Sequence, residues 1–224
     1  MVMRYLAIAI LVLTLLLSLN VASATIEEAV ITTGPGERSS SSTLNASFDV
    51  TGGNETSENI TGTAVTSRWT GFYGNLSGNV VLGDATRSVF RAWNVHKFKD
   101  GVVYAANDSV GDWSSTNIQP ATTTDLPGYL IQPATDNFTN TFTDTKTFSS
   151  ASLNVKNTYY TRSLNNTRGE SFYTYALKST SDDALVFAGI AEDDANSFKG
   201  STVDYQLIAP AQENTTYEFY LELP

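Results

Sequence analysis

RWTGFYGNLSGNVVLGD, residues 68–84, is the stretch that most clearly indicates a β fold. It sets one Trp, one Phe and one Tyr beside four glycines and closes on Val80, Val81 and Leu82. Aromatic residues with closely spaced Gly and Asn, followed by a β-branched run, are typical of two strands joined by a tight turn. We therefore predict a core hairpin here, with Trp69 and Tyr73 on its buried face and Asn75 exposed at the turn.

Further short strands follow this stretch as far as the end of the chain. The last is the clearest, because the apolar side chains of residues 217–223 alternate with Glu218, Tyr220 and Glu222. A period of two indicates half-buried antiparallel strands. We predict an all-β fold, an antiparallel β-sandwich or jelly-roll-like single domain over residues 59–224. The other predicted strands are Ser88–Val95, Gly101–Ala106, Thr145–Ser149, Ser152–Ser163, Ser171–Ser179, Ala184–Ile190, Thr202–Ala209 and Thr216–Leu223.

Residues 107–135 interrupt this series of strands. They contain Pro120, Pro127 and Pro133, and proline cannot donate the backbone hydrogen bond that a central strand needs. We predict a long connection with one helical turn near Asp125.

The first 24 residues indicate secretion. Arg4 precedes an apolar run, and Ala22-Ser23-Ala24 supplies the small residues of a cleavage site, so residues 1–24 are predicted to be a signal peptide. The alternative is an uncleaved membrane anchor, since the apolar stretch approaches the minimum length for crossing a bilayer. In either case we expect an extracellular or cell-surface protein, with membrane contact only through this segment if it is uncleaved.

Residues 25–58 are predicted to form an N-terminal arm. The arm begins with a β-prone patch, TIEEAVITTG, and continues through a polar linker at residues 35–42 that contains four consecutive serines. One interpretation is a glycosylated arm without fixed structure. The other is a strand on a tether that completes the sheet of another molecule, with Ile26, Ala29, Val30 and Ile31 as the donated residues.

Composition limits the partners. The chain has no cysteine, so packing and backbone pairing must hold a secreted domain together without disulfides. Removing Arg4 leaves 12 basic against 23 acidic side chains, a net charge of 12 − 23 = −11. Nucleic acids and anionic membrane surfaces attract basic faces, so we predict neither as a partner. Calcium and a cationic partner remain compatible with this charge.

Eight N-x-S/T triplets are candidate glycosylation sites. Some are expected by chance in a chain rich in Asn, Ser and Thr, but a signal peptide makes the use of several of them expected. A used site must lie at the surface. The eight acceptors are Asn45, Asn54, Asn59, Asn75, Asn107, Asn137, Asn165 and Asn214.

No residue pattern indicates catalysis, and we predict no enzyme and no cofactor other than calcium. His96 is the single histidine, so a base held by an orienting partner has no obvious source. Asp193, Asp194 and Asn196 offer clustered oxygen ligands and are the calcium candidates, although they lack the spacing of a known calcium loop. The alternative for these residues is turn chemistry, which also favours Asp and Asn.

Aromatic residues could form a platform on which sugars stack. For Trp69 and Trp93 we favour core packing, because both lie in predicted strands. Trp113 lies in the predicted connection and is the best candidate for glycan stacking.

Two blocks of the sequence resemble a set of secreted archaeal surface proteins. The first block combines WTGFYGNLSGNVVL at 69–82 with Trp93, GVVYA at 101–105, Trp113 and Ile118. The second combines residues 172–177 and 187–190 with VDYQLIAP at 203–210 and YEFYLEL at 217–223. The resemblance implies a β-rich fold at the cell surface and no particular activity. Relatives tend to carry a cysteine just after the position of Ile118, where this chain has Gln119 and Pro120, so any family disulfide is missing here.

Together these features favour a structural cell-surface protein, a glycosylated filament or coat subunit that assembles by strand donation from the N-terminal arm. Its partner would be itself, as a homopolymer, or other surface proteins. The alternative function is a monomeric extracellular module that binds carbohydrate or mediates adhesion.

Overall fold

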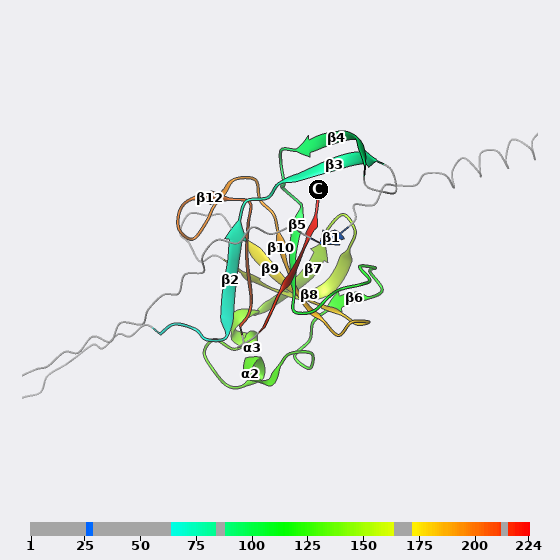
Figure 1. Cartoon of the computed structure of the whole chain (residues 1–224). Helices are drawn as coiled ribbons and strands as arrows, with labels where there is room; N and C mark the ends of the chain where they lie inside the picture. Colours follow the sequence, from blue (N-terminus) through cyan, green and yellow to red (C-terminus); the bar gives the residue numbers. More distant parts are fainter. Residues whose placement is uncertain (1–25, 29–63, 84–87, 164–171, 212–214) are drawn as a thin grey trace, which may run out of the picture.

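The computed structural model describes residues 26–28, 64–83, 88–163, 172–211 and 215–224, and Figure 1 shows how these parts are arranged. Two short helices accompany the strands, α2 (Gly128–Ile131) and α3 (Phe138–Thr141). The strands are β1 (Ile26–Glu28), β2 (Trp69–Gly74), β3 (Gly78–Gly83), β4 (Val89–Val95), β5 (Val102–Ala106), β6 (Ile118–Pro120), β7 (Asp144–Ser149), β8 (Asn154–Arg162), β9 (Tyr173–Ser179), β10 (Leu185–Ile190), β11 (Ala195–Asn196), β12 (Thr202–Val203), β13 (Tyr205–Pro210) and β14 (Glu218–Glu222).

One large antiparallel sheet organises the molecule. Its strand order is β1-β14-β5-β10-β9-β8-β7, and β6 pairs with β9 beside this path. Three further pairs stand outside it, β2 with β13, β3 with β4, and β11 with β12. The predicted all-β class and antiparallel sandwich are confirmed.

The sheet curls around an apolar core on one of its faces. Phe148 of β7 lies near Tyr104 of β5, with ring centroids 6.2 Å apart, although three strands separate β7 from β5 in the sheet. The curling therefore brings β7 over the core toward β5. The buried residues of this core are Val102, Tyr104, Ala106, Val110, Ile118, Phe148, Leu153, Val155, Tyr175, Leu177, Ala184, Val186, Ala188 and Tyr220.

The opposite face of the sheet is covered by the β2–β13 pair and the two helices. Leu207 of β13 is fully buried, and Gly189 of β10 lies beneath it. A Cβ added at Gly189 would be 3.1 Å from the Cβ of Leu207, so glycine allows the two layers to pack closely. Strands β5 and β10 are therefore covered on both faces, which explains why their residues are almost all buried.

The structure corrects the predicted core hairpin at residues 68–84. Strand β2 pairs with β13, and β3 pairs with β4, so the two halves of the stretch do not pair with each other. Phe72, and not Tyr73, packs among the buried aromatics, with ring centroids 4.9 Å from Phe219. Trp93, expected in the core, is 46% exposed on β4. Alternation specifies strands but not their partners, and here a distant strand supplied the better apolar contact.

The structure also corrects the prediction that the last strand is buried on one face only. Phe219 and Leu221 pack toward β13, as expected. Tyr220 and Glu222, expected to be exposed, are 7% and 1% exposed. The curled sheet encloses this second face, and hydrogen bonds satisfy the polar atoms that it buries.

The connection at residues 107–135 contains more structure than expected. It includes β6, which pairs with β9 and has Pro120 as its last residue. The helix α2 begins at Gly128, three residues after Asp125, whose carboxylate instead accepts a hydrogen bond from the Thr122 N–H at 2.7 Å. Among the described residues, no helix is both long and apolar enough to cross a membrane.

Candidate functional site

The first candidate site is the sheet edge formed by β1 and β14. Ile26, Glu27 and Glu28 pair antiparallel with Glu222, Leu221 and Tyr220, respectively. The Ile26 side chain is half-buried and packs against the core on the curled face. Strand β1 thus belongs to the sheet of the domain, although the domain was predicted to begin at residue 59. Ala29, Val30 and Ile31 lie outside the described residues.

A buried carboxylate lies under this edge. Glu222, which pairs with Ile26, accepts hydrogen bonds from the Tyr104 hydroxyl at 2.5 Å and from the Ser152 N–H at 2.6 Å. Burial, together with the Glu222 carboxyl, raises the pKa of Tyr104 well above its ordinary value. The three groups join β14, β5 and the β7–β8 turn, so they hold β14 in place from beneath.

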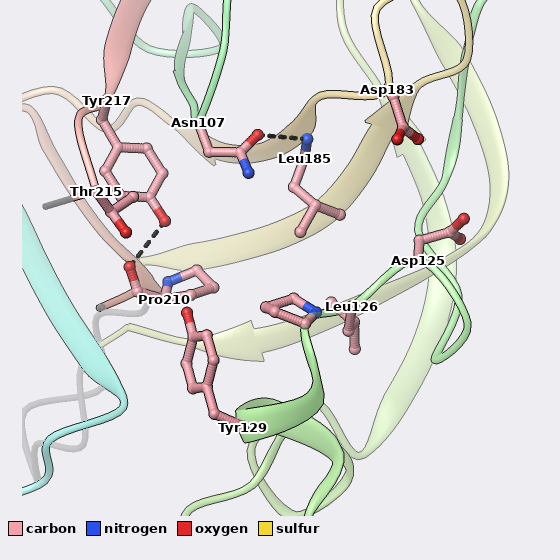
Figure 2. A pocket seen from close by; sticks show the side chains of 10 residues that line it. Asn107, Asp125, Leu126, Tyr129, Asp183, Leu185, Pro210, Thr215 and Tyr217 are labelled. Atoms are coloured by element: carbon pink, nitrogen blue, oxygen red, sulfur yellow. Dashed lines mark hydrogen bonds between the residues drawn. The ribbon is translucent and has the colours of Figure 1, made fainter. Parts of the chain in front are cut away.

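The second candidate site is a pocket at the end of the domain where β5 and β13 finish and β10 and β14 begin (Figure 2). We call it the Tyr129–Tyr217 pocket. Its cavity volume is about 270 Å³, slightly below the ~300 Å³ at which pockets for drug-sized ligands begin. It suits one large side chain or one sugar ring. The lining residues are Asn107, Asp125, Leu126, Pro127, Tyr129, Asp183, Leu185, Pro210, Thr215 and Tyr217.

Charges at the rim of this pocket are partly neutralised. The Lys178 amine bonds to Asp125 at 2.9 Å and to Asp183 at 2.8 Å. Hydrogen bonds with these two carboxylates raise the pKa of Lys178. Burial acts to raise the pKa of Asp125, but hydrogen bonds from Lys178 and Thr122 outweigh it and lower that pKa. Two carboxylates against one amine leave the rim with a net negative charge.

Two tyrosines give the pocket its aromatic wall. The Tyr217 hydroxyl donates to the Pro210 carbonyl at 2.8 Å, which fixes the ring at one side of the pocket in Figure 2. Burial, with Tyr129 nearby, raises the pKa of Tyr217, and burial alone raises that of Tyr129. Both hydroxyls therefore stay neutral near pH 7 and offer hydrogen bonds but no charge.

Trp113, the predicted stacking residue, is half-buried between two tyrosines. Its ring centroid lies 4.9 Å from that of Tyr104 and 4.9 Å from that of Tyr220. Each ring contact is tilted or edge-on, and the indole packs against the core. Tyr104 and Tyr220 thus already contact the indole ring. Glycan stacking at Trp113 stays a prediction, and the Tyr129–Tyr217 pocket offers a second aromatic location for it.

The predicted calcium residues lie in and around the loop between β10 and β11. Asp193 forms an ion pair with Lys97 at 3.6 Å, and the Asp194 N–H donates to the buried Asp204 carboxylate at 3.4 Å. Asn196 lies in β11. Within the described ranges, no three or more His, Cys, Asp or Glu side chains form a group that could hold a metal ion. Calcium binding here stays a prediction.

Three of the eight candidate glycosylation sites lie in described segments. Asn75 and Asn107 are exposed, as a used site requires. Asn137 is half-buried and caps α3, accepting from the Asn140 N–H at 2.9 Å, so a glycan there would have to share the side chain with the cap. The five acceptors Asn45, Asn54, Asn59, Asn165 and Asn214 lie outside the described residues.

Comparison of the chain with protein-family models, with curated proteins and with solved structures gives no match. The suggested kinship with archaeal surface proteins therefore stays an expectation.

Sequence reasoning missed the pocket and the pairing of β1 with β14. The pocket combines loops before β14, after β5 and around α2, which lie far apart in the chain. No local pattern could have predicted that combination. Strand β14 had a signal, since the clean alternation of residues 217–223 marked a strand, but its neighbours depend on sheet order.

Proposed function

We propose that this protein is a secreted, glycosylated structural subunit of the cell surface, which forms filaments or a coat by donating β1 to another copy. The observation that carries the proposal is the pairing of Ile26–Glu28 with β14. A three-residue strand from the far N-terminal part of the chain occupies the outermost position of the large sheet.

An outermost strand of this kind can be exchanged between molecules. When β1 leaves, β14 becomes the edge, and its unpaired backbone groups are a template for the same segment from a neighbour. The exchanged pairing is chemically identical to the one within a single chain, so exchange costs little beyond the ordering of the tether. Residues 29–63 connect β1 to the rest of the domain and supply that tether.

The exchanged contact joins two different surfaces, so it can repeat without closing. The donor is the N-terminal segment and the acceptor is β14, so the two contact surfaces differ. Repetition of a contact between unlike surfaces produces a fibre unless the rotation happens to close a ring. We therefore favour filaments over closed oligomers.

Deletion of residues 25–34 from the secreted chain tests the proposal. We expect filaments to disappear from negative-stain images, because the β14 edge loses its donor. A matched deletion of Ser39–Ser42 shortens the tether but keeps β1, and should leave filaments in place. A synthetic TIEEAVITTG peptide should bind the deletion variant and restore its thermal stability. Filaments that survive the deletion of residues 25–34 would contradict strand donation.

A monomeric carbohydrate-binding module is the second candidate function, and the Tyr129–Tyr217 pocket supports it. Tyrosine rings and carboxylates are groups that bind the faces and hydroxyls of sugars. Under this alternative, a glycan array should give hits that Tyr129→Ala abolishes and Trp113→Phe leaves unchanged. The absence of any hit on the array would count against it.

A further inference from the structure

The hairpin formed by β3 and β4 carries an unusual amount of apolar surface. Phe90 is 85% exposed, and five other large apolar side chains are between 46% and 57% exposed. In Figure 1 the two strands extend from the domain at the end opposite α2 and α3. The other five residues are Val80, Val81, Leu82, Val89 and Trp93.

Both faces of this hairpin are apolar. Val80 pairs with Trp93, so these two share one face, while Val81 pairs with Ala92 on the other. Among the described residues, neither strand pairs with a third one. A two-stranded hairpin alone is marginally stable in water, and apolar surface gathered in one place commonly marks an interaction site. The hairpin therefore needs a partner to cover it.

Charge distinguishes the kind of partner. Strands β3 and β4 carry one basic side chain, Arg91, and no acidic one, within a chain of net charge −10. The rest of the chain therefore carries 12 basic against 23 acidic side chains, a net charge of 12 − 23 = −11. Arg91 lies in the apolar surface itself, with its guanidinium 5.2 Å from the centre of the Trp93 ring. The partner should be apolar and acidic.

A second hairpin offers Arg91 no counter-charge. The described strands of the hairpin carry Arg91 and no acidic side chain, so a contact between two hairpins would leave both guanidinium groups unpaired. The partner surface should therefore lie elsewhere on the second copy.

The end that carries the Tyr129–Tyr217 pocket meets both requirements. Strand β5 begins beside the hairpin and finishes at Ala106, directly before Asn107 on the pocket rim, so hairpin and pocket lie at opposite ends of the domain. Leu126, Pro127 and Tyr217 give the cavity an apolar part, and the cavity is large enough for one aromatic side chain. Two acidic side chains, Asp125 and Asp183, also line it, and Lys178 neutralises only part of their charge.

We propose that the β3–β4 hairpin of one copy docks at the Tyr129–Tyr217 pocket of the next copy, with Phe90 entering the cavity and Arg91 facing its acidic rim. An exposed apolar projection that fits a pocket at the other end of the same molecule produces open, head-to-tail assembly. The inference rests on the proposed self-assembly and adds a second contact to it. One hairpin is small for a stable interface, so it would act together with strand donation.

Cysteine cross-linking tests this contact directly, because the chain contains no cysteine of its own. The variant keeps Phe90 and carries Val89→Cys beside it on the hairpin, where the side chain is exposed, and Thr215→Cys on the exposed pocket rim. The two sites cannot bond within one copy, since β5 alone spans about 13 Å between the two ends. Mild oxidation should give a ladder of covalent multimers on a non-reducing gel.

The matched control is Val89→Cys with Lys156→Cys, which places the second thiol at an exposed position on β8, outside the pocket lining. We expect about tenfold less product beyond the dimer from this control. Equal ladders from the two variants would overturn the proposal. Dimers of the Val89→Cys single variant as abundant as the ladder would also overturn it, since they indicate a two-fold hairpin contact.

The same cross-linking in the chain lacking residues 25–34 separates this inference from strand donation. A ladder together with loss of filaments supports both contacts. A ladder together with unchanged filaments supports the hairpin contact and contradicts strand donation. No ladder in either background, with filaments that depend on residues 25–34, contradicts the hairpin contact alone.

Discussion

Strand β14 and the β3–β4 hairpin are both rich in apolar residues but have opposite surroundings. Both were predicted as strands, β14 from its alternation and β3 from its β-branched run. In β14, the two faces are covered, and even Glu222 is buried. In the hairpin, Val80, Leu82 and Phe90 remain exposed. An alternating pattern thus predicts a strand, but only the neighbouring strands decide whether it becomes part of a core.

This difference suggests a division of roles. The large sheet buries its apolar side chains and forms hydrogen bonds with its buried polar groups, so it provides the stability of the domain. The β1 edge, the hairpin and the pocket lie at the periphery of the domain, where another molecule can reach them. Variants in the large sheet and variants at these three peripheral sites should therefore differ in their effects.

The largest expected effect comes from a matched pair of phenylalanines. Phe187 on β10 is fully buried, so Phe187→Ala should lower the free energy of unfolding by about 3–5 kcal/mol. Phe90→Ala on the hairpin should change it by no more than about 0.5 kcal/mol. Urea unfolding of the unassembled protein measures both. A destabilisation by Phe90→Ala as large as that by Phe187→Ala would show that the hairpin belongs to the core.

A smaller effect is expected from the buried carboxylate. Glu222→Ala leaves the Tyr104 hydroxyl and the Ser152 N–H without their buried acceptor, which should cost about 2–4 kcal/mol. Glu222→Gln keeps the shape and can bond to both groups if the tyrosine hydroxyl accepts, so it should cost much less. Urea unfolding of the two variants tests this order. Equal losses would show that the negative charge, and not the hydrogen bonding, holds β14.

The smallest expected effect is the change in melting temperature with pH that arises from Asp125 at the pocket rim. The pKa of Asp125 is lowered in the folded protein, so its stabilising contribution is present above its unfolded pKa of about 3.9. The contribution is lost as the pH falls through the lower folded value. Asp125→Asn should therefore flatten the decline in melting temperature below about pH 4 and leave the slope above pH 5 unchanged. An unaltered acid profile would mean that Asp125 and Lys178 contribute nothing measurable.

Sequence reasoning performed well where a pattern is local. Strands β4, β5, β7 to β10, β13 and β14 lie close to their predicted positions, because alternation and turn residues are properties of neighbouring side chains. The short strands β6 and β11 were not predicted. Sequence reasoning failed at residues 68–84, where β2 crosses to β13 instead of pairing with β3. Two strands close in sequence usually pair, but here Phe72 gains apolar contacts with Tyr217 and Phe219 that β3 does not offer.

The two candidate sites differ more strongly in how far the sequence predicted them. Ile26 was singled out because β-branched residues next to a polar linker predict a strand on a tether, and Ile26–Glu28 does form a strand. The pocket combines Asn107, Leu126 and Tyr217 from three separate loops, and no spacing in the chain relates them.

The sequence by itself determined the β class, the positions of most strands and the absence of disulfides, because each depends on residue type and local period. The tertiary structure decided which strands became core and which stayed exposed. It enclosed Glu222, exposed Trp93 and placed the apolar hairpin at the end opposite the Tyr129–Tyr217 pocket. Burial is set by what packs on each face, and that depends on contacts between residues far apart in the chain.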